Sequence, residues 1–174
     1  MRAFIALELP DAFADEVAGL SRQLSQVCEG RFVPAESYHL TLAFLGEVGE
    51  AEAASAVSAL EAACAGCGPV ELRPSGLGTF GRGRDVTLWL GIEKDPELVR
   101  LASRVREQLD ARGLAYDEKP FSPHVTLARR VRGLEGSLDG LAFPLADEAC
   151  RVTLFRSHLD AGGARYKPLF STDL

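Results

Sequence analysis

One tetrapeptide pattern occurs twice in the chain and constrains its fold more than any other feature. His39-Leu40-Thr41-Leu42 and His124-Val125-Thr126-Leu127 lie 85 residues apart, about half of the 174-residue chain. Each pattern follows a stretch with helical periodicity and lies in a run that is typical of a β-strand. The repetition predicts a domain built from two similar halves.

Alternation along a strand predicts which way the side chains of each motif point. The histidine and the threonine are two residues apart and share one face, while the aliphatic residues occupy the other face. We expect the aliphatic residues to pack in the core and the polar pair to lie on an open face. If a pseudo-twofold axis relates the halves, the two strands can meet and bring two imidazoles and two hydroxyls together.

The predicted elements follow a repeating order and indicate an α+β fold. Strands are expected over residues 2–9, 38–45, 85–92, 124–129, 150–159 and 164–172, with a short extended piece at 31–33. The run at 70–80 looks extended but is broken by Pro74, Gly76 and Gly78. Three helices are expected from apolar faces formed by Phe13, Val17, Leu20, Leu24 and Val27, by Ala53, Val57, Leu60 and Cys64, and by Leu98, Leu101, Val105 and Leu109. No linker separates independent domains. We therefore expect one domain over residues 1–174, with halves at about 1–92 and 93–174.

Charge and composition limit the class of protein. The net charge is −6, whereas a protein that coats long nucleic acid is usually basic, so a nucleic-acid substrate should be held at a small local site. Four cysteines are too few for a disulfide scaffold. Glu8 interrupts the apolar opening, and no run approaches the length of a membrane span. We expect a cytoplasmic protein, with no signal peptide and no membrane association.

The paired motifs suit acid–base chemistry on a phosphate. Histidine titrates near neutral pH, so one ring can accept a proton while the other donates one. Threonine hydroxyls can bind the non-bridging oxygens of a phosphate and of its transition state. No carboxylate belongs to either motif, and two histidines fall short of a zinc site. The set fits metal-free hydrolysis of a strained phosphodiester, although the residues alone do not say which histidine is the acid.

Three other features are expected to be incidental. Residues 76–81 match a dinucleotide-binding fingerprint in letters, but a strand follows them where a helix is required, so we expect a flexible turn. Cys64 and Cys67 form a C-x-x-C without a second pair. His158 has no partner motif and is expected on the surface or in a hairpin.

The motifs and their flanking residues resemble the two-histidine phosphoesterase superfamily, and within it the RNA 2′,3′-cyclic phosphodiesterases, also called 2′-5′ RNA ligases. The resemblance covers nearly the whole chain. The matching segments are Arg2-Ala3-Phe4-Ile5-Ala6-Leu7, Tyr38 to Gly46, Trp89-Leu90-Gly91, Pro120 to Arg129, Phe155-Arg156-Ser157 and Tyr166-Lys167-Pro168-Leu169.

The resemblance implies a bilobed fold, with two pseudo-symmetric halves of antiparallel sheet and helices around a central cleft. It implies hydrolysis of a terminal RNA 2′,3′-cyclic phosphate to a 2′-phosphomonoester without metal or cofactor. His39 would donate a proton to the leaving 3′ oxygen, and His124 would activate water. Thr41 and Thr126 would hold the phosphate. With an RNA 5′-hydroxyl the same site would form a 2′-5′ linkage, and the partners would be RNA ends or small cyclic nucleotides bound by a monomer.

The chain departs from the family pattern at two positions. Ala43 and Ser122 stand where many members have a basic residue, and Ala43 is expected on the same face as His39. Arg129 and Arg130 are therefore expected to bind substrate, with Arg132 and Arg156 as further candidates. Strict alternation places Arg130, and not Arg129, on the face of His124.

Two alternative functions stay open. One is a related phosphodiesterase that acts on ADP-ribose cyclic phosphate or on 2′-5′ linked oligonucleotides. The other is a nucleotide-binding module that keeps the cleft without turnover. A substrate panel distinguishes the first alternative, and binding without hydrolysis would favour the second.

Overall fold

The structure is a computed structural model that describes residues 1–136, 138–161 and 163–174. Its strands are β1 (Arg2–Glu8), β2 (Glu29–Phe32), β3 (His39–Glu47), β4 (Val70–Leu72), β5 (Pro74–Phe80), β6 (Thr87–Ile92), β7 (His124–Arg132), β8 (Asp147–Ala149), β9 (Arg151–Asp160) and β10 (Gly163–Asp173). Its helices are α1 (Asp11–Leu24), α2 (Glu50–Cys64) and α3 (Pro96–Asp110), with a short 3₁₀ turn, η1 (Ala35–Ser37). The expected mixture of helices and antiparallel strands is confirmed.

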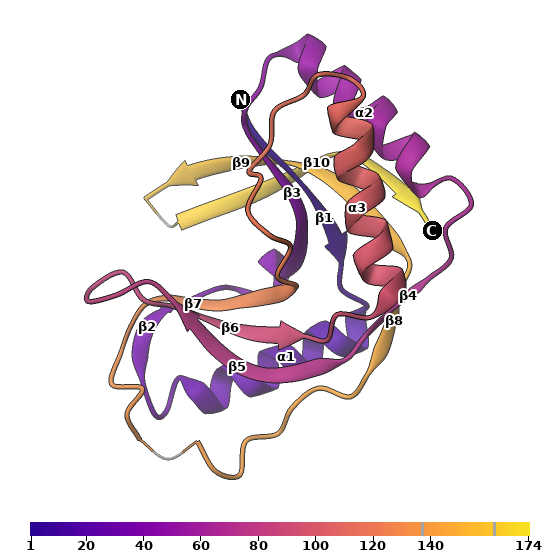
Figure 1. Cartoon of the computed structure of the whole chain (residues 1–174). Coiled ribbons are helices and arrows are strands. Elements are labelled where there is room, and N and C mark those ends of the chain that lie inside the picture. The colour runs from indigo at the N-terminus through magenta and orange to yellow at the C-terminus, as the bar shows by residue number, and fades with distance from the viewer. Residues whose placement is uncertain (137, 162) are drawn as a thin grey trace.

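Two half-sheets form the frame of the molecule (Figure 1). The first half-sheet has the order β10-β9-β1-β3, and the second has β5-β6-β7 with β2 on the other edge of β7. A single bridge between Leu40 of β3 and Val125 of β7 joins them. Strands β4 and β8 form a separate small ladder.

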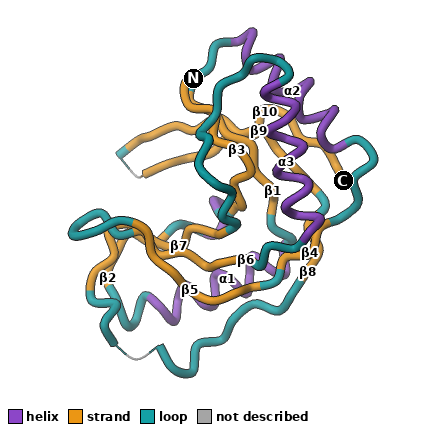
Figure 2. Tube along the Cα trace, in the orientation of Figure 1, coloured by secondary structure: helices purple, strands orange, loops and turns teal. Residues whose placement is uncertain are grey.

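Each half-sheet is covered by helices on one side (Figures 1 and 2). Helices α2 and α3 pack beside each other over the first half-sheet, and α1 lies along the second. The buried aliphatic residues of β1, β3, β6 and β7 face these helices and form one continuous core. Because helices cover only one side, the other side of the frame stays open. Among the described residues, no helix has the length and apolar character needed to cross a bilayer.

The half-sheets do not correspond to the two halves of the sequence. Strand β1, from the start of the chain, pairs with β9 from its end, with Phe4 opposite Phe155. Strand β7, from the second half, pairs with β6 and β2 from the first. A boundary near residue 92 therefore marks the pseudo-repeat in sequence but does not separate the two half-sheets.

Two helix faces differ from the sequence expectation. Helix α1 ends at Leu24, and Val27 is 40% exposed, because the chain turns and buries Cys28 in its place. On α2 the buried face includes Ala56, Ala59 and Ala63, whereas Ala53 and Val57 are only partly buried. Alanine allows close packing against α3 and the sheet, so the small residues and not the valine face the core.

Candidate active site

The two motifs lie side by side at the joint between the half-sheets. Leu40 and Val125 form the bridge between β3 and β7 and are fully buried. In an antiparallel register this bridge places His39 next to Thr126 and Thr41 next to His124. All four polar residues are partly exposed, while the aliphatic residues between them are buried, so the predicted alternation is confirmed.

A bulge after each motif changes the faces of the residues that follow. The ladder skips Leu42 on β3, which leaves Ala43 opposite Ile5 and Phe44 opposite Phe4. The ladder skips Leu127 on β7 in the same way. Each strand therefore buries two successive residues, and alternation resumes one residue out of phase.

The bulges overturn two expectations about which residues share the strand face of the histidines. Ala43 is 1% exposed and belongs to the core face, so it does not lie beside His39 and Thr41. On β7, Arg129 is brought to the site face opposite Thr87, and the Arg129 charge acts on the His39 ring. Arg130 follows with φ of 54°, a left-handed conformation that interrupts the strand alternation. Arg129, rather than Arg130, is thus the arginine beside the motifs.

Both histidine rings are fixed in the same manner. Nδ1 of His39 lies 2.8 Å from the carbonyl oxygen of Ser37, and Nδ1 of His124 lies 2.6 Å from that of Ser122. A carbonyl oxygen can only accept, so Nδ1 carries the proton in each ring. Each Nε2 is consequently left to accept or donate a proton on the open side. The sequence pattern did not reveal these two carbonyl groups.

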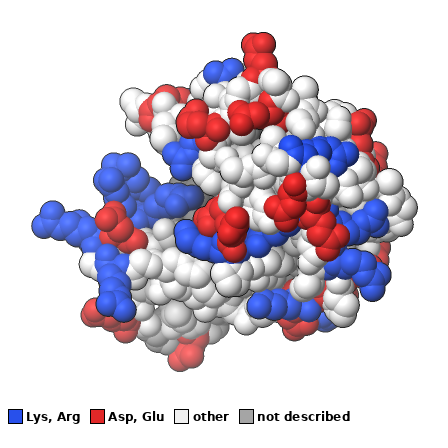
Figure 3. Space-filling view, turned by 45° about the horizontal axis from the view of Figure 1, so that its top comes forward, with Lys and Arg blue, Asp and Glu red and all other residues white. Residues whose placement is uncertain are grey.

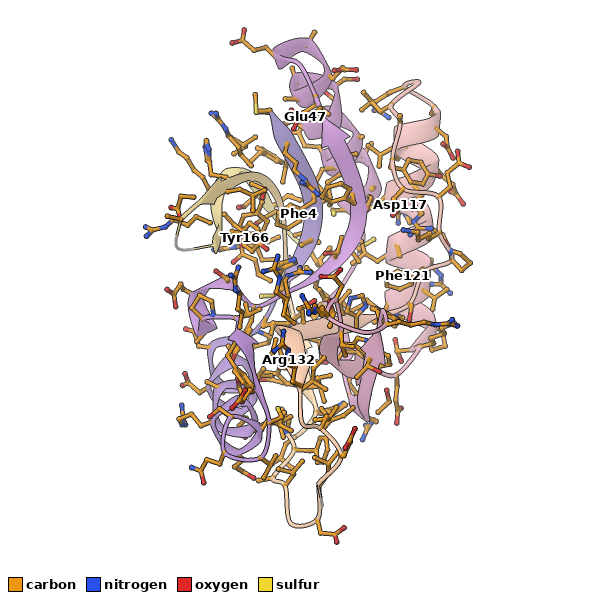
Figure 4. The ribbon with its side chains drawn as sticks, turned by 90° about the vertical axis from the view of Figure 1, so that its left-hand side faces the viewer. Phe4, Glu47, Asp117, Phe121, Arg132 and Tyr166 are labelled. Carbon is orange, nitrogen blue, oxygen red and sulfur yellow. The ribbon has the colours of Figure 1, made fainter. Side chains whose placement is uncertain are left out.

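Each imidazole also packs against two aromatic rings from other strands of its own half-sheet. His39 lies 4.8 Å from Phe4 and 5.0 Å from the edge-on ring of Tyr166, measured between centroids. His124 lies 5.1 Å from the edge-on ring of Phe80 and 6.0 Å from Trp89. Figure 4 looks into the open side, with Phe4 and Tyr166 above and Arg132 below. No sequence pattern identifies these aromatic neighbours, because the contacts depend on how the strands pair.

Glycines next to His124 make room for the Trp89 ring. A Cβ on Gly78 would lie 2.1 Å from Cη2 of Trp89, and a Cβ on Gly91 would lie 3.1 Å from Cζ3 of Trp89. The indole therefore lies across both glycines. The glycine-rich segment at residues 76–81 is mostly the strand β5 (Pro74–Phe80), so the expected flexible turn is wrong. Within this segment, Gly78 is the glycine that makes room for the Trp89 ring.

The two histidines differ in their surroundings. Burial lowers the pKa of His39, and the positive charge of Arg129 and the proximity of His124 lower the pKa further. The hydrogen bond to the Ser37 carbonyl opposes these effects. In the free protein, His39 is therefore predominantly neutral at pH 7.

A carboxylate lies opposite His39 in the β1–β3 ladder. Glu8 is the cross-strand neighbour of His39, and its carboxylate accepts a hydrogen bond from the buried Thr153 hydroxyl. Thr153 Oγ1 also lies 2.7 Å from the Ser171 hydroxyl. This network connects β1 to β9 and β10, the strand that carries Tyr166.

Arg106 of α3 connects the two motif segments behind the site. Its guanidinium donates to the carbonyl of Leu42 at 3.4 Å and to that of Lys119 at 2.9 Å. The same group lies 5.6 Å above the Tyr116 ring and 6.0 Å from the Phe121 ring. Leu42 belongs to the first motif, and Phe121 precedes the carbonyl that fixes His124. Arg106 therefore contacts both segments at once.

The remaining candidates lie elsewhere. His158 is exposed on the β9–β10 hairpin, as expected. Arg156 is opposite the buried Ala3, so its register places it on the helix side of β1 rather than with Phe4. Cys67 Sγ accepts a hydrogen bond from Arg104 at the end of α2. Within the described part of the chain, no three His, Cys, Asp or Glu residues gather as metal ligands could.

Comparisons with known proteins point to one family. A family model for the 2′-5′ RNA ligase superfamily matches residues 9–154. An RNA 2′,3′-cyclic phosphodiesterase of Geobacillus stearothermophilus is 36% identical over 132 residues, 75% of this chain but only 42% of that protein. The RNA 2′,3′-cyclic phosphodiesterase of Escherichia coli (strain K12) is 33% identical over 169 residues, 97% of this chain and 93% of that protein.

Solved structures match over the whole chain. Escherichia coli LigT complexed with 3′-AMP superposes with a TM-score of 0.80 at 30% identity, covering 99% of this chain and 97% of LigT. The protein TT0787 of Thermus thermophilus gives a TM-score of 0.77 at 28% identity, covering 100% of this chain and 98% of TT0787. These likenesses agree with the expected phosphoesterase architecture of two half-sheets.

Proposed function

The chain belongs to the 2′-5′ RNA ligase superfamily, and on that basis we propose that it is an RNA 2′,3′-cyclic phosphodiesterase. It hydrolyses the cyclic phosphate at an RNA end to a 2′-phosphomonoester and a free 3′-hydroxyl. The names of the Geobacillus and Escherichia relatives support this assignment. The observation that carries it is the pair of histidines with fixed Nδ1 atoms on either side of one β-bridge.

In the proposed reaction, water attacks phosphorus and the bond from phosphorus to the 3′ oxygen breaks. Nε2 of His124 accepts the proton of the attacking water, and protonated Nε2 of His39 donates its proton to the leaving 3′ oxygen. General acid and general base catalysis each contribute about 10²- to 10⁴-fold in rate. The contacts that fix the two Nδ1 atoms are equivalent and do not distinguish the acid from the base. The family pattern therefore assigns the two roles.

Because the pKa of His39 is lowered in the free protein, we expect substrate binding to promote protonation of this acid. Burial and the Arg129 charge disfavour the imidazolium in the free protein. A bound cyclic phosphate brings a negative charge beside Arg129, which offsets that repulsion and raises the pKa of His39. His39 would therefore take up a proton as the substrate binds.

The threonines and Arg129 hold the phosphate in this proposal. Thr41 and Thr126 share the face of the histidines, so their hydroxyls can donate to the non-bridging oxygens. The Arg129 guanidinium supplies the positive charge for the developing negative charge of the transition state. With an RNA 5′-hydroxyl in place of water, the same groups would form a 2′-5′ linkage.

The decisive experiment determines which product forms from a dinucleotide with a 2′,3′-cyclic phosphate. We expect the 2′-phosphate, formed at an unchanged rate in EDTA because no metal takes part in the proposed steps. Formation of the 3′-phosphate would mean that the 2′ oxygen, and not the 3′ oxygen, is the leaving group. A requirement for metal would contradict the mechanism.

A second candidate substrate class is suggested by the ligands of a relative. Escherichia coli LigT has been crystallised with ATP and with NADP⁺ as well as with 3′-AMP. ADP-ribose cyclic phosphate and 2′-5′ oligonucleotides should therefore be assayed beside the cyclic RNA end. Tight nucleotide binding without turnover across a broad pH range would instead indicate a binding module.

A further inference from the structure

Six exposed arginines gather on the rim of the second half-sheet, and we call this group the arginine surface. They come from three segments, β2, the β5–β6 loop and the end of β7, and are Arg31, Arg82, Arg84, Arg129, Arg130 and Arg132. Figure 3 shows Lys and Arg side chains gathered on the left of the molecule, the side on which Figure 1 places these segments and, above them, the β9–β10 hairpin. The chain as a whole has a net charge of −6, so this concentration of positive charge is local.

In the described part of the chain, none of the six arginines of the arginine surface forms an ion pair with an acidic side chain. Among residues 1–136, 138–161 and 163–174, the ion pairs of arginine involve Arg73, Arg100, Arg151 and Arg165, and none of the arginine surface. Glu29 is opposite Arg132 in the ladder, yet the two side chains do not form an ion pair within 4 Å. The surface therefore keeps its positive charge for a ligand.

Two of these positive charges oppose each other directly. Arg31 of β2 is the cross-strand partner of Arg129 of β7. Like charges at such positions destabilise a sheet. A bound polyanion would remove this repulsion, because guanidinium groups bind phosphate oxygens in bidentate fashion.

The arginine surface begins at the candidate active site and leads away from it. Arg129 acts on the His39 ring, and Arg31 lies beside Arg129. The loop that carries Arg82 and Arg84 starts directly after Phe80, whose ring contacts His124. The base of that loop is fixed to β7 by the hydrogen bond from Val131 N to Val86 O at 3.0 Å.

We propose that the arginine surface binds the phosphodiester backbone of the RNA strand on the 5′ side of the cyclised nucleotide. The inference rests on the proposed function, since only the 5′ side of a cyclic-phosphate end continues as a chain. The substrate class is therefore an RNA oligomer with several phosphates, which the enzyme prefers to a cyclic mononucleotide. Each phosphate neutralised on a single strand contributes about 0.7 to the slope of log affinity against log salt.

The test uses a triple variant, Arg31→Gln, Arg82→Gln and Arg84→Gln, which leaves Arg129 and both motifs intact. The control is Arg22→Gln, Arg73→Gln and Arg100→Gln, which changes the net charge equally at exposed arginines elsewhere. Both proteins and the wild type are assayed on 2′,3′-cyclic AMP and on a six-nucleotide RNA with a 2′,3′-cyclic phosphate. Binding of the same RNA with a 3′-phosphate is measured by fluorescence anisotropy at several salt concentrations.

We expect the triple variant to keep the wild-type kcat/KM on 2′,3′-cyclic AMP within twofold and to lose at least tenfold on the hexamer. The salt slope for hexamer binding should become shallower by about 2, since three contacts are lost. The control should match the wild type on both substrates.

Equal losses in the triple variant and the control would overturn the proposal, as would equal losses on the two substrates. Binding of oligoglutamate as tightly as the RNA would assign the surface to acidic proteins instead. If the wild type hydrolyses neither substrate, the proposed function fails, and the anisotropy measurement still decides whether the arginine surface binds RNA.

Discussion

Phe44 on β3 and Arg129 on β7 occupy equivalent positions in the two halves of the site. Each is the third residue after a motif threonine, and each follows a buried alanine behind a bulge. Phe44 lies opposite Phe4, whereas Arg129 lies opposite Thr87. The duplicated frame thus carries one apolar and one cationic residue, and this difference makes the surroundings of the two histidines unequal.

Replacing Arg129 should reduce catalysis much more than replacing Arg130. Arg129→Met removes the charge beside the motifs, and a hydrogen bond to a charged group is worth about 1.5–3 kcal/mol, so kcat/KM should fall about 10- to 100-fold. Arg130→Met is the matched control, because the left-handed backbone conformation of Arg130 interrupts the strand alternation. Steady-state assays on 2′,3′-cyclic AMP measure both. Equal losses in the two variants would contradict the placement of Arg129.

Each motif histidine should be essential for turnover and dispensable for folding. His39→Gln and His124→Gln should each lower kcat by about 10²- to 10⁴-fold, because each removes a proton-transfer group. The double variant should lose less than the product of the two factors, since the groups act together. His158→Gln, at an exposed position, should keep full activity. Thermal unfolding followed by circular dichroism checks the fold, and an active His124→Gln protein would refute the assigned role.

The depressed pKa of His39 should appear in the stability of the protein. The unfolded chain binds a proton at this histidine near the ordinary pKa of about 6.5, whereas burial and Arg129 lower the pKa in the folded state. The contribution of neutral His39 to the free energy of unfolding is therefore fully present above pH 6.5 and declines as the pH falls below it. Urea unfolding at pH 7.5 and 5.5 should show a smaller decline in His39→Gln than in the wild type. An identical decline would argue against the shift.

The packing of Trp89 on Gly78 should be sensitive to one methyl group. A Cβ at residue 78 would come within 2.2 Å of two ring atoms, so Gly78→Ala must displace the indole. Overpacking of this kind costs about 1–3 kcal/mol. Trp89 is the only tryptophan in the sequence, and its fluorescence should report the displacement directly. Gly68→Ala, where the added methyl group meets nothing within 4 Å, should leave the spectrum and the stability unchanged.

Arg106 should act as a positioning residue for both motifs. Arg106→Met removes the donors to Leu42 and Lys119 but retains an apolar side chain, so kcat should fall about tenfold while KM changes little. Arg106→Lys should restore part of the rate. Arg100→Met, which loses only an exposed ion pair with Glu97 on the same helix, is the control. A variant that is less stable but fully active at a temperature where it is folded would reduce Arg106 to a structural role.

Local patterns predicted most elements and the faces of the motif residues. Period-two alternation correctly placed His39 and Thr41 on the open face, because burial of Leu40 and Leu42 leaves no other register. Alternation failed at Ala43 and Arg130, since a bulge adds one residue to a strand and reverses the faces beyond it. The sequence contains no local signal for such an insertion.

The amino-acid sequence by itself determined the paired histidines and threonines, the duplicated strands that carry them and the family to which they point. Only the tertiary structure decided which arginine reaches the site, which carbonyls fix the imidazoles and which aromatic rings contact them. These features depend on the register between strands far apart in the chain, such as β1 with β9 and β2 with β7. Register is set by the packing of the whole core, so no short segment can specify it alone.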